Sequence, residues 1–243
     1  MDAHGADVWL ILPTYNEAEN VEAITAAARR ALPRSHRILV VDDASPDGTG
    51  RIADRLAAQH DDLEVMHRPA KSGLGPAYVE GFRRALAGGA QRVIQMDADF
   101  SHEPAYLPRL LDASGRADLV LGSRYVPGGG VTEWGQVRRF ISKAGSAYAR
   151  IALGIPIRDL TGGFKCWRRE ALEAIPLGAV RSLGYAFQVE MTYRALRAGF
   201  HVAEVPITFR ERRVGASKMS RAIVVEAVWR VPWLRAAALA GRI

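Results

Sequence analysis

Five short apolar runs in the first half of the chain alternate with segments of helical periodicity. The runs are rich in β-branched residues and about as long as buried parallel strands usually are; they cover 8–12, 37–41, 63–66, 92–96 and 118–122. The segments between them repeat apolar residues at i, i+3 and i+4, as amphipathic helices do; they cover 17–32, 47–60, 75–89 and 104–113. This alternation predicts an α/β domain with a mostly parallel sheet flanked by helices.

Local signals predict where helices begin and how the second half continues. Asn16 and Ser45 each precede residues typical of a first helical turn, so we expect both to be N-caps. The glycine-rich stretch "VPGGGVTEWG" (126–135) predicts a loop, followed by a basic helical stretch at 136–154. A further amphipathic helix is expected at 182–200.

Composition narrows the class of protein. A chain of 243 residues with one cysteine, Cys166, has no intrachain disulfide and no multi-cysteine metal site, and we expect that cysteine to be buried. No apolar run reaches about 18 residues and no signal peptide is recognisable, which favours a cytoplasmic protein without a membrane span. The formal net charge of +7 favours anionic partners such as nucleic acid, a phospholipid surface or a phosphorylated substrate.

Polar clusters follow four of the predicted strands. They read "PTYNE" (13–17), "DDASPDG" (42–48), "DAD" (97–99) and "GSRY" (122–125). Ligands of open parallel sheets bind at the carboxyl ends of the strands. Three acidic clusters and an arginine on one rim therefore indicate a ligand site.

The pair Asp97 and Asp99 has two interpretations. Residues i and i+2 of an extended segment point to the same side, where two carboxylates repel each other and a divalent cation would relieve the repulsion. In the alternative, Asp97 ends the strand and Asp99 starts a turn. The pair alone does not decide between them.

Three other classes of protein fit less well. "GTGRIA" (48–53) matches a dinucleotide-binding pattern, but Asp42, Asp43 and Asp47 stand between it and the strand and would repel a pyrophosphate. A nucleic-acid-binding protein would need a contiguous basic strip with stacking aromatics, whereas acids occupy these strand ends, so we expect no nucleic-acid partner. Intact acidic motifs argue against a non-catalytic membrane scaffold.

Six motifs in order carry a resemblance to a known family. They are "ILPTYNEAENV", "VVDDASPDGTG", "KSGLGPAYVEGF", "MDADFSHEP", "LGSRYVPGG" and "FRERRVGASKMS". Together they resemble family 2 glycosyltransferases with the Rossmann-like GT-A fold, and more narrowly the polyprenol-phosphate (dolichol-phosphate) mannosyltransferases. The resemblance implies a catalytic domain at 1–220, with a nucleotide-sugar half at about 1–125 and an acceptor half at about 126–220.

The resemblance also implies an activity and its partners. Such enzymes transfer mannose from GDP-mannose to a polyprenyl phosphate, invert the anomeric centre and use Mg²⁺ or Mn²⁺. The alternatives are transfer of glucose from UDP-glucose to the same lipid, or transfer to a sugar acceptor. The acceptor phosphate is already largely ionised near neutral pH, so no general base is expected.

Site residues follow from the resemblance as well. Asp97 and Asp99 are implied as metal ligands, although Ser101 replaces the glutamine that the family often uses as a third ligand. Asp99 and Arg124 are implied as catalytic residues. Arg124, Arg138 and Ser142 are implied at the acceptor phosphate, whereas Arg138 with Arg139 and Lys143 also fits a solvated helix face. The implied donor-binding residues are Pro13, Tyr15, Glu17, Val41, Asp43, Asp97, Ala98, Asp99, Arg212 and Lys218.

The last segment, 221–243, has two interpretations. Its tryptophans and arginines suit an amphipathic helix lying at a membrane surface and kinked at Pro232. Alternatively, it is a helix packed on the domain. A prenyl acceptor requires peripheral contact with the cytoplasmic face of a membrane, through this segment or through a membrane-anchoring partner protein. Glu190 either pairs with an arginine or faces the site, and His102 is expected to be a turn residue.

Overall fold

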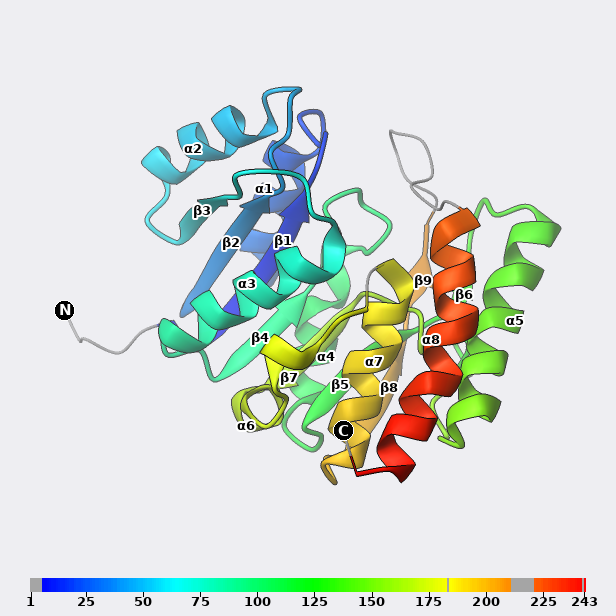
Figure 1. Ribbon diagram of the computed structural model, residues 1–243. Helices are drawn as coiled ribbons and strands as arrows, with labels where there is room; N and C mark the ends of the chain where they lie inside the picture. The colour runs from blue at the N-terminus through cyan, green and yellow to red at the C-terminus, as the bar shows by residue number, and fades with distance from the viewer. Residues whose placement is uncertain (1–5, 183, 211–220, 242) are drawn as a thin grey trace.

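A mixed sheet runs through the computed structural model, which describes residues 6–182, 184–210, 221–241 and 243 (Figure 1). In the described chain this sheet has seven strands in the order β3-β2-β1-β4-β7-β5-β8. All neighbouring pairs are parallel except those of β7, which runs antiparallel to β4 and β5. The strands are β1 (Val8–Thr14), β2 (His36–Asp42), β3 (Leu63–His67), β4 (Arg92–Gln95), β5 (Leu119–Ser123), β7 (Lys165–Arg168) and β8 (Val202–Pro206).

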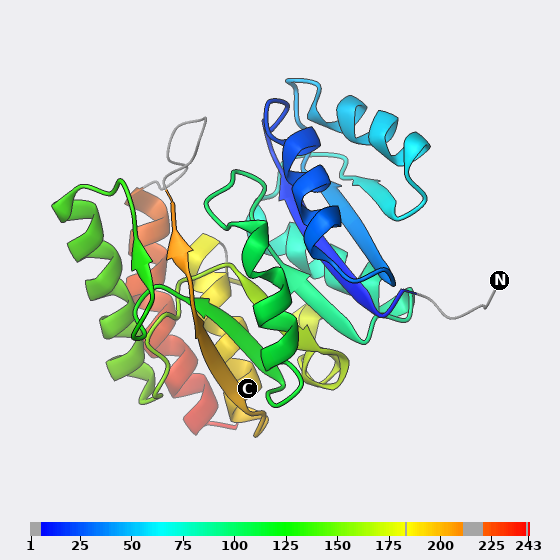
Figure 2. The same cartoon turned by 180° about the vertical axis from the view of Figure 1, so that it is seen from behind.

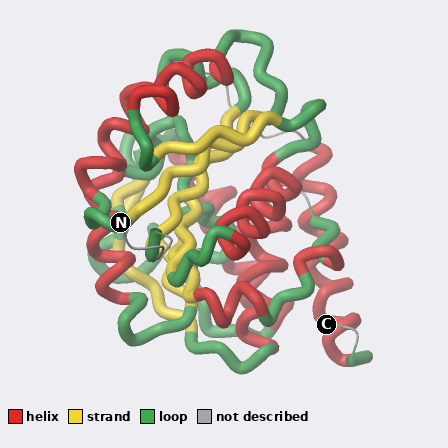
Figure 3. Tube along the Cα trace, turned by 90° about the vertical axis from the view of Figure 1, so that its left-hand side faces the viewer, coloured by secondary structure: helices red, strands yellow, loops and turns green. Residues whose placement is uncertain are grey.

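Helices cover both faces of the sheet (Figures 2 and 3). They are α1 (Val21–Ala31), α2 (Thr49–Gln59), α3 (Leu74–Ala87), α4 (Leu107–Ala113), α5 (Gln136–Leu153), α6 (Arg169–Glu173), α7 (Gly184–Arg197) and α8 (Arg221–Leu239), with 3₁₀ turns η1 (Pro104–Tyr106) and η2 (Leu177–Ala179). Two short strands, β6 (Gly130–Val131) and β9 (Thr208–Phe209), pair in parallel beside the main sheet. The predicted architecture, a mostly parallel sheet between helices, is confirmed.

Strand alternation divides the core into two layers. Along β1, Trp9 and Ile11 face the layer that contains Phe82 of α3 and the buried side of α7. Leu10 of the same strand faces the opposite layer, with α1 and Leu107 of α4. Successive strand residues point to opposite faces. Val93 and Gln95 of β4 and Lys165 and Trp167 of β7 therefore also face α7. This places Gln95 and Lys165, register partners across β4 and β7, beneath that helix.

Both expected N-caps are wrong. Helix α1 begins at Val21 and α2 at Thr49, several residues after Asn16 and Ser45. The backbone N–H of Asn16 instead donates to the Ser45 hydroxyl at 3.1 Å, and that of Glu17 donates to the Thr49 hydroxyl at 2.9 Å. The two loops therefore hold each other at the rim of the sheet instead of starting helices there.

Helix α8 continues through Pro232 and presents two different faces. Val231, Leu234, Ala237 and Ala238 are buried against the domain, and α8 contacts both α5 and α7. Trp229 and Leu239 are 76% and 78% exposed. One face of the helix therefore packs on the domain, as the second interpretation of this segment expects, and the other exposes large apolar side chains, as the first expects. No helix within the described residues is long and apolar enough to cross a membrane.

Candidate active site

The acidic pair lies in a loop that follows β4. Because β4 ends at Gln95, Asp97 and Asp99 are not on one extended segment as the simple strand argument assumed. Asp97 Oδ1 accepts a hydrogen bond from the Tyr78 hydroxyl at 3.3 Å, and Asp99 Oδ1 accepts one from the Ser101 backbone N–H at 3.0 Å. The loop's own hydrogen bonds, together with α3, hold both carboxylates at the rim.

His102 was expected to be a turn residue, but it is buried in the floor of this loop. Its Nδ1 accepts the Asp97 backbone N–H at 3.2 Å, and its ring stacks on Phe164 with centroids 5.0 Å apart. Burial lowers its pKa more than Asp97 and Asp99 raise it. The ring is therefore neutral at physiological pH and can accept the hydrogen bond that orients the loop.

Tyr78 supports the same loop from α3. Burial raises its pKa well above the usual value, and the negative charge of Asp97 raises it further. The phenol therefore keeps its proton and remains a donor to Asp97. Tyr78 did not stand out in the sequence, because an aromatic residue at a core position of a helix carries no special signal.

The oxygen atoms around this loop suit a hard divalent cation. Besides the two carboxylates, the Ser101 hydroxyl is buried with no hydrogen-bond partner among the described residues. Within the described chain, no group of three or more histidine, cysteine, aspartate or glutamate residues gathers as a metal site. Two carboxylates and a hydroxyl fit a cation that takes its remaining ligands from water and from a substrate phosphate, as Mg²⁺ does.

The expected nucleoside-binding residues gather at the carboxyl ends of β1 and β2. The Lys71 ammonium lies 3.7 Å from the ring centroid of Tyr15, and Glu17 accepts a 2.8 Å hydrogen bond from the Asn20 amide. Pro13 is partly exposed, whereas Val41 lies entirely within the core. Among these residues the structure therefore offers Tyr15 and Pro13, but not the side chain of Val41, at the accessible rim.

Asp43 has a clear local role. Its carboxylate accepts hydrogen bonds from the Ser72 backbone N–H at 3.0 and 3.1 Å and from the Gly73 backbone N–H at 2.8 Å. It also pairs with Arg68, which binds Glu80 as well. Asp43 thus fixes the turn that leads into α3. Arg68 is a partner that sequence reasoning missed, since nothing in "HRPAKSG" distinguishes it from a surface arginine.

Arg124 is buried and paired. Its Nε and Nη2 donate to the two carboxylate oxygens of Asp159 at 2.7 and 2.6 Å, and Nη2 also donates to Thr161 at 2.9 Å. Its guanidinium lies 5.3 Å from the ring centroid of Phe209. Burial lowers the pKa of Arg124, but Asp159 outweighs that effect and the net pKa is raised, so the arginine stays charged.

Arg138 and Ser142 of α5 approach the same place. The Arg138 guanidinium lies 4.4 Å from the ring centroid of Trp134, whose ring also lies 5.7 Å from Arg124. The Tyr125 hydroxyl donates to Ser142 at 2.7 Å. The structure therefore brings Arg124, Arg138 and Ser142 together. Arg212 and Lys218 lie outside the described residues.

His102 lies between the carboxylate loop at Asp97 and Asp99 and the basic group at Arg124. Its ring meets Phe209 edge-on with centroids 5.3 Å apart, and Phe209 in turn contacts Arg124. The charges of Asp97, Asp99, Arg124 and Asp159 all influence the pKa of His102. One buried imidazole thus lies between the carboxylate loop and the paired arginine. Asp159 is distant in sequence from both, and only the fold reveals it.

Glu190 proves to be an internal partner of arginines. It has no exposed surface, forms a fork with Arg194 at 3.0 and 2.8 Å, and lies 3.3 Å from Arg230 of α8. Burial raises its pKa, but Ser182, Arg194 and Arg230 outweigh that effect and the net pKa is lowered. The first alternative considered for this residue is therefore confirmed.

Known proteins resemble this chain in sequence. The profile of Glycosyl transferase family 2 matches residues 9–175. The chain belongs to glycosyltransferase family 2. An undecaprenyl-phosphate mannosyltransferase from Micrococcus luteus is 52% identical over 221 residues, which cover 91% of this chain and 90% of that protein. A polyprenol monophosphomannose synthase from Mycolicibacterium smegmatis is 52% identical over 224 residues, covering 91% and 84%.

Solved structures of other proteins share the fold. Glucosyl-3-phosphoglycerate synthase from Mycobacterium tuberculosis, in complex with Mn²⁺, UDP-glucose and phosphoglyceric acid, superposes with a TM-score of 0.66 at 21% identity. The match covers 93% of this chain and 80% of that one. The GT-A-like α/β fold expected from the six motifs is confirmed. At this identity the likeness concerns the fold alone.

Proposed function

We propose that the chain transfers mannose from GDP-mannose to the phosphate of a polyprenyl monophosphate, releases GDP and inverts the anomeric carbon. The observation that carries the proposal is the juxtaposition across His102 of the carboxylate loop at Asp97 and Asp99 with the basic group at Arg124 and Arg138. A site with a cation-binding half and an anion-binding half suits a diphosphate donor and a phosphate acceptor. The names of both 52% identical relatives support mannosyl transfer to a polyprenyl phosphate, and GDP-mannose as the donor is our proposal.

On the donor side, Asp97 and Asp99 would hold Mg²⁺ or Mn²⁺, with Ser101 as the third oxygen. When bound, the cation neutralises the charge that develops on the leaving diphosphate. Pro13 and Tyr15 form the accessible wall of the nucleoside pocket, the buried Glu17 lies beside them, and Val41 supports the pocket from the core. Asp43 shapes the turn beside that pocket through Ser72 and Gly73. Ala98, Arg212 and Lys218 stay predicted contacts of the donor diphosphate.

On the acceptor side, the lipid phosphate is its own nucleophile. Its second pKa is ~6, so it is mostly ionised at pH 7 and needs no protein base. The residues have to bring two anions together and hold the nucleophilic oxygen in line with the anomeric carbon. Arg138 and Ser142 bind the acceptor phosphate, and the buried Arg124 supplies a fixed positive field beside it.

The outward faces of α5 and α8 extend the acceptor side into a membrane-docking surface. The two helices lie side by side at one flank of the molecule (Figures 1 and 2). Their exposed large apolar residues are Val137, Phe140, Ile141, Tyr148, Ile151, Trp229, Trp233 and Leu239. Exposed basic residues of α5, such as Arg139 and Lys143, complement anionic headgroups. The occupant of this surface is the cytoplasmic face of a membrane. A membrane-anchoring partner protein stays a prediction.

One assay tests the reaction. Radiolabelled GDP-mannose is incubated with the protein and a synthetic polyprenyl monophosphate, and the label in the organic phase is counted with Mg²⁺, with Mn²⁺ and with EDTA. We expect metal-dependent transfer that is lost in EDTA and restored by added cation. Transfer from UDP-glucose but not from GDP-mannose would show that the proposed donor is wrong and that UDP-glucose takes its place. Transfer to sugar acceptors alone would overturn the proposal.

A further inference from the structure

A chain of oriented hydrogen bonds lies beneath Asp97. The indole N–H of Trp167 can only donate, and it donates to Gln95 Oε1 at 2.6 Å. The Gln95 amide is thereby fixed with its nitrogen toward α7, where Nε2 donates to Gln188 Oε1 at 3.3 Å. This in turn fixes the Gln188 amide. Its Nε2 is buried and has no hydrogen-bond partner within the described residues.

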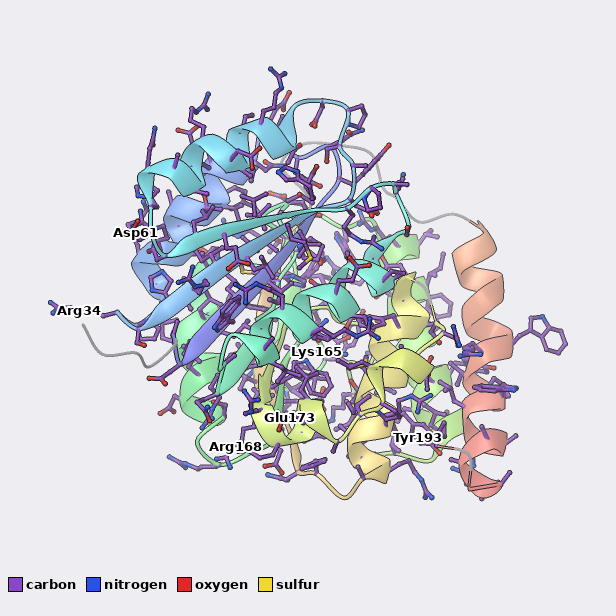
Figure 4. The ribbon with its side chains drawn as sticks, turned by 60° about the vertical axis from the view of Figure 1, so that its left-hand side comes forward. Arg34, Asp61, Lys165, Arg168, Glu173 and Tyr193 are labelled. Carbon is purple, nitrogen blue, oxygen red and sulfur yellow. The ribbon has the colours of Figure 1, made fainter. Side chains whose placement is uncertain are left out.

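The backbone of Gln188 is fixed as well. The Lys165 amino group, in the interior beneath α7 (Figure 4), donates to the Gln188 carbonyl at 2.7 Å and to the Thr192 hydroxyl at 2.9 Å. Gln188 is 1% exposed and Lys165 is fully buried. Gln188 is therefore held at its carbonyl and at its side-chain oxygen, and only its side-chain N–H groups are unused. Unsatisfied buried donors are rare in folded proteins and need an explanation.

The missing side chain of Gly163 leaves room for one methyl-sized group between that amide and the acidic loop. A Cβ atom added at Gly163 would lie 3.4 Å from Gln188 Nε2 and 3.5 and 3.6 Å from the two carboxylate oxygens of Asp97. The unused donor and the carboxylate therefore border the same space. A hydroxyl group matches it, because its oxygen can accept from the amide while its proton is donated to the carboxylate. A phosphate oxygen would accept from the amide but would be repelled by Asp97.

We propose that Gln188 recognises the sugar of the donor: its Nε2–H donates to one hydroxyl of the hexose being transferred. Trp167 and Gln95 orient that donor, and Gly163 keeps the space free. The assignment rests on the proposed function, because it takes the ligand beside Asp97 to be a nucleotide sugar. It makes Gln188 a specificity-determining residue in α7, where the sequence analysis had considered Glu190 but not Gln188.

Isothermal titration in the presence of Mg²⁺ tests the assignment, with GDP-mannose and GDP as paired ligands. Gly163→Ala places a methyl group in the gap at ordinary contact distances and leaves the hydrogen-bond chain intact. Gln188→Met removes the amide. Loss of one neutral hydrogen bond predicts about tenfold weaker binding of GDP-mannose for both variants, with GDP affinity unchanged within about twofold. Gly178→Ala, where the added Cβ would lie 3.6 Å from the Arg83 guanidinium, is the control for glycine replacement and should leave both affinities unchanged.

Analogues of GDP-mannose that each lack one hydroxyl sharpen the test. One of them should bind the wild type about tenfold more weakly than GDP-mannose, and Gln188→Met should not distinguish the two. Equal losses for GDP and GDP-mannose, or unchanged binding of both in Gly163→Ala, would overturn the assignment. If the wild type binds UDP-glucose instead, the donor is wrong, and the same comparison of UDP-glucose with UDP tests Gln188 independently.

Discussion

Replacing Arg124 by methionine should destabilise the domain severely. Asp159 has no exposed surface, and Arg124 supplies the hydrogen bonds from Nε and Nη2 that meet its charge. After the substitution, the Asp159 carboxylate keeps the hydrogen bond from the backbone N–H of residue 124 at 2.9 Å but loses both bonds from the guanidinium. An uncompensated buried charge of this kind costs ~3–5 kcal/mol, a large share of the ~5–15 kcal/mol that stabilises a typical domain.

Urea denaturation followed by circular dichroism measures this cost, with Asp159→Leu and the double variant Arg124→Met/Asp159→Leu completing the double-mutant cycle. Since the double variant removes both charges, it should be less destabilised than the two single changes added together, by at least ~2 kcal/mol. A loss below ~1 kcal/mol in Arg124→Met would refute the reasoning. Arg124 would then be free to bind the acceptor phosphate directly, instead of acting as a fixed cation held by Asp159.

Three further outcomes are expected. Asp99→Ala should abolish transfer of label to lipid while the far-ultraviolet circular dichroism stays unchanged, and retained turnover in Mg²⁺ would remove Asp99 from the metal site. Phe140→Ser with Trp229→Ser should weaken binding to anionic vesicles at least ~10-fold, since each aromatic ring buries enough apolar surface to contribute ~1.5–3 kcal/mol; equal binding in a sedimentation assay would place the membrane on another face. The acid limb of the pH–rate profile should lie near ~6, the second ionisation of the acceptor, and should move with a more acidic phosphate analogue; a limb that stays in place would indicate a protein base.

Point substitutions test the membrane surface better than removal of residues 221–243. Val231 and Leu234 of α8 are buried in the core, and Arg230 donates to Ser182 at 2.9 Å and pairs with the buried Glu190. Removing the segment would expose apolar surface on α5 and α7 and take a cation away from Glu190. A loss of activity on every acceptor would then report unfolding and would say nothing about lipid contact.

The parallel half of the fold could be predicted from the sequence because periodicity alone encodes it. The five expected strands all form, within one or two residues of their expected ends. Their carboxyl ends meet at one rim, as the topology of open sheets requires. For the same reason the clusters at Tyr15, Asp43, Asp97 and Arg124 could be recognised as a site before any contact was known.

The second half carried weaker signals. Strand β7 reads "KCWR" and contains Lys165 and Arg168, so it lacks the apolar run of a buried strand. Its antiparallel insertion between β4 and β5 depends on long-range pairing that periodicity does not report. Asp159 and His102 were missed for a related reason, since their importance comes from partners distant in sequence. The N-cap expectation at Asn16 was wrong because loop-to-loop hydrogen bonds outcompeted local capping.

Lys165 provides a last prediction, on pH and stability. Burial lowers its pKa from 10.5 to about 7, although the charge of Asp159 acts to raise it. Between these two values the unfolded chain holds a proton that the native state has released, so the free energy of unfolding should rise with pH in this window. The slope is at most ~1.4 kcal/mol per pH unit, which gives roughly 2–3 kcal/mol between pH 7 and pH 9.

Lys165→Met isolates this contribution, because methionine fills similar space without a charge. The free energy of unfolding of the wild type minus that of Lys165→Met, from urea titrations at pH 6, 7, 8 and 9, should be nearly constant up to pH 7 and then increase. A difference that stays flat to pH 9 would contradict the lowered pKa. The ammonium would then keep its proton in the interior, and the carbonyl of Gln188 would be held by a full positive charge at every pH where the site works.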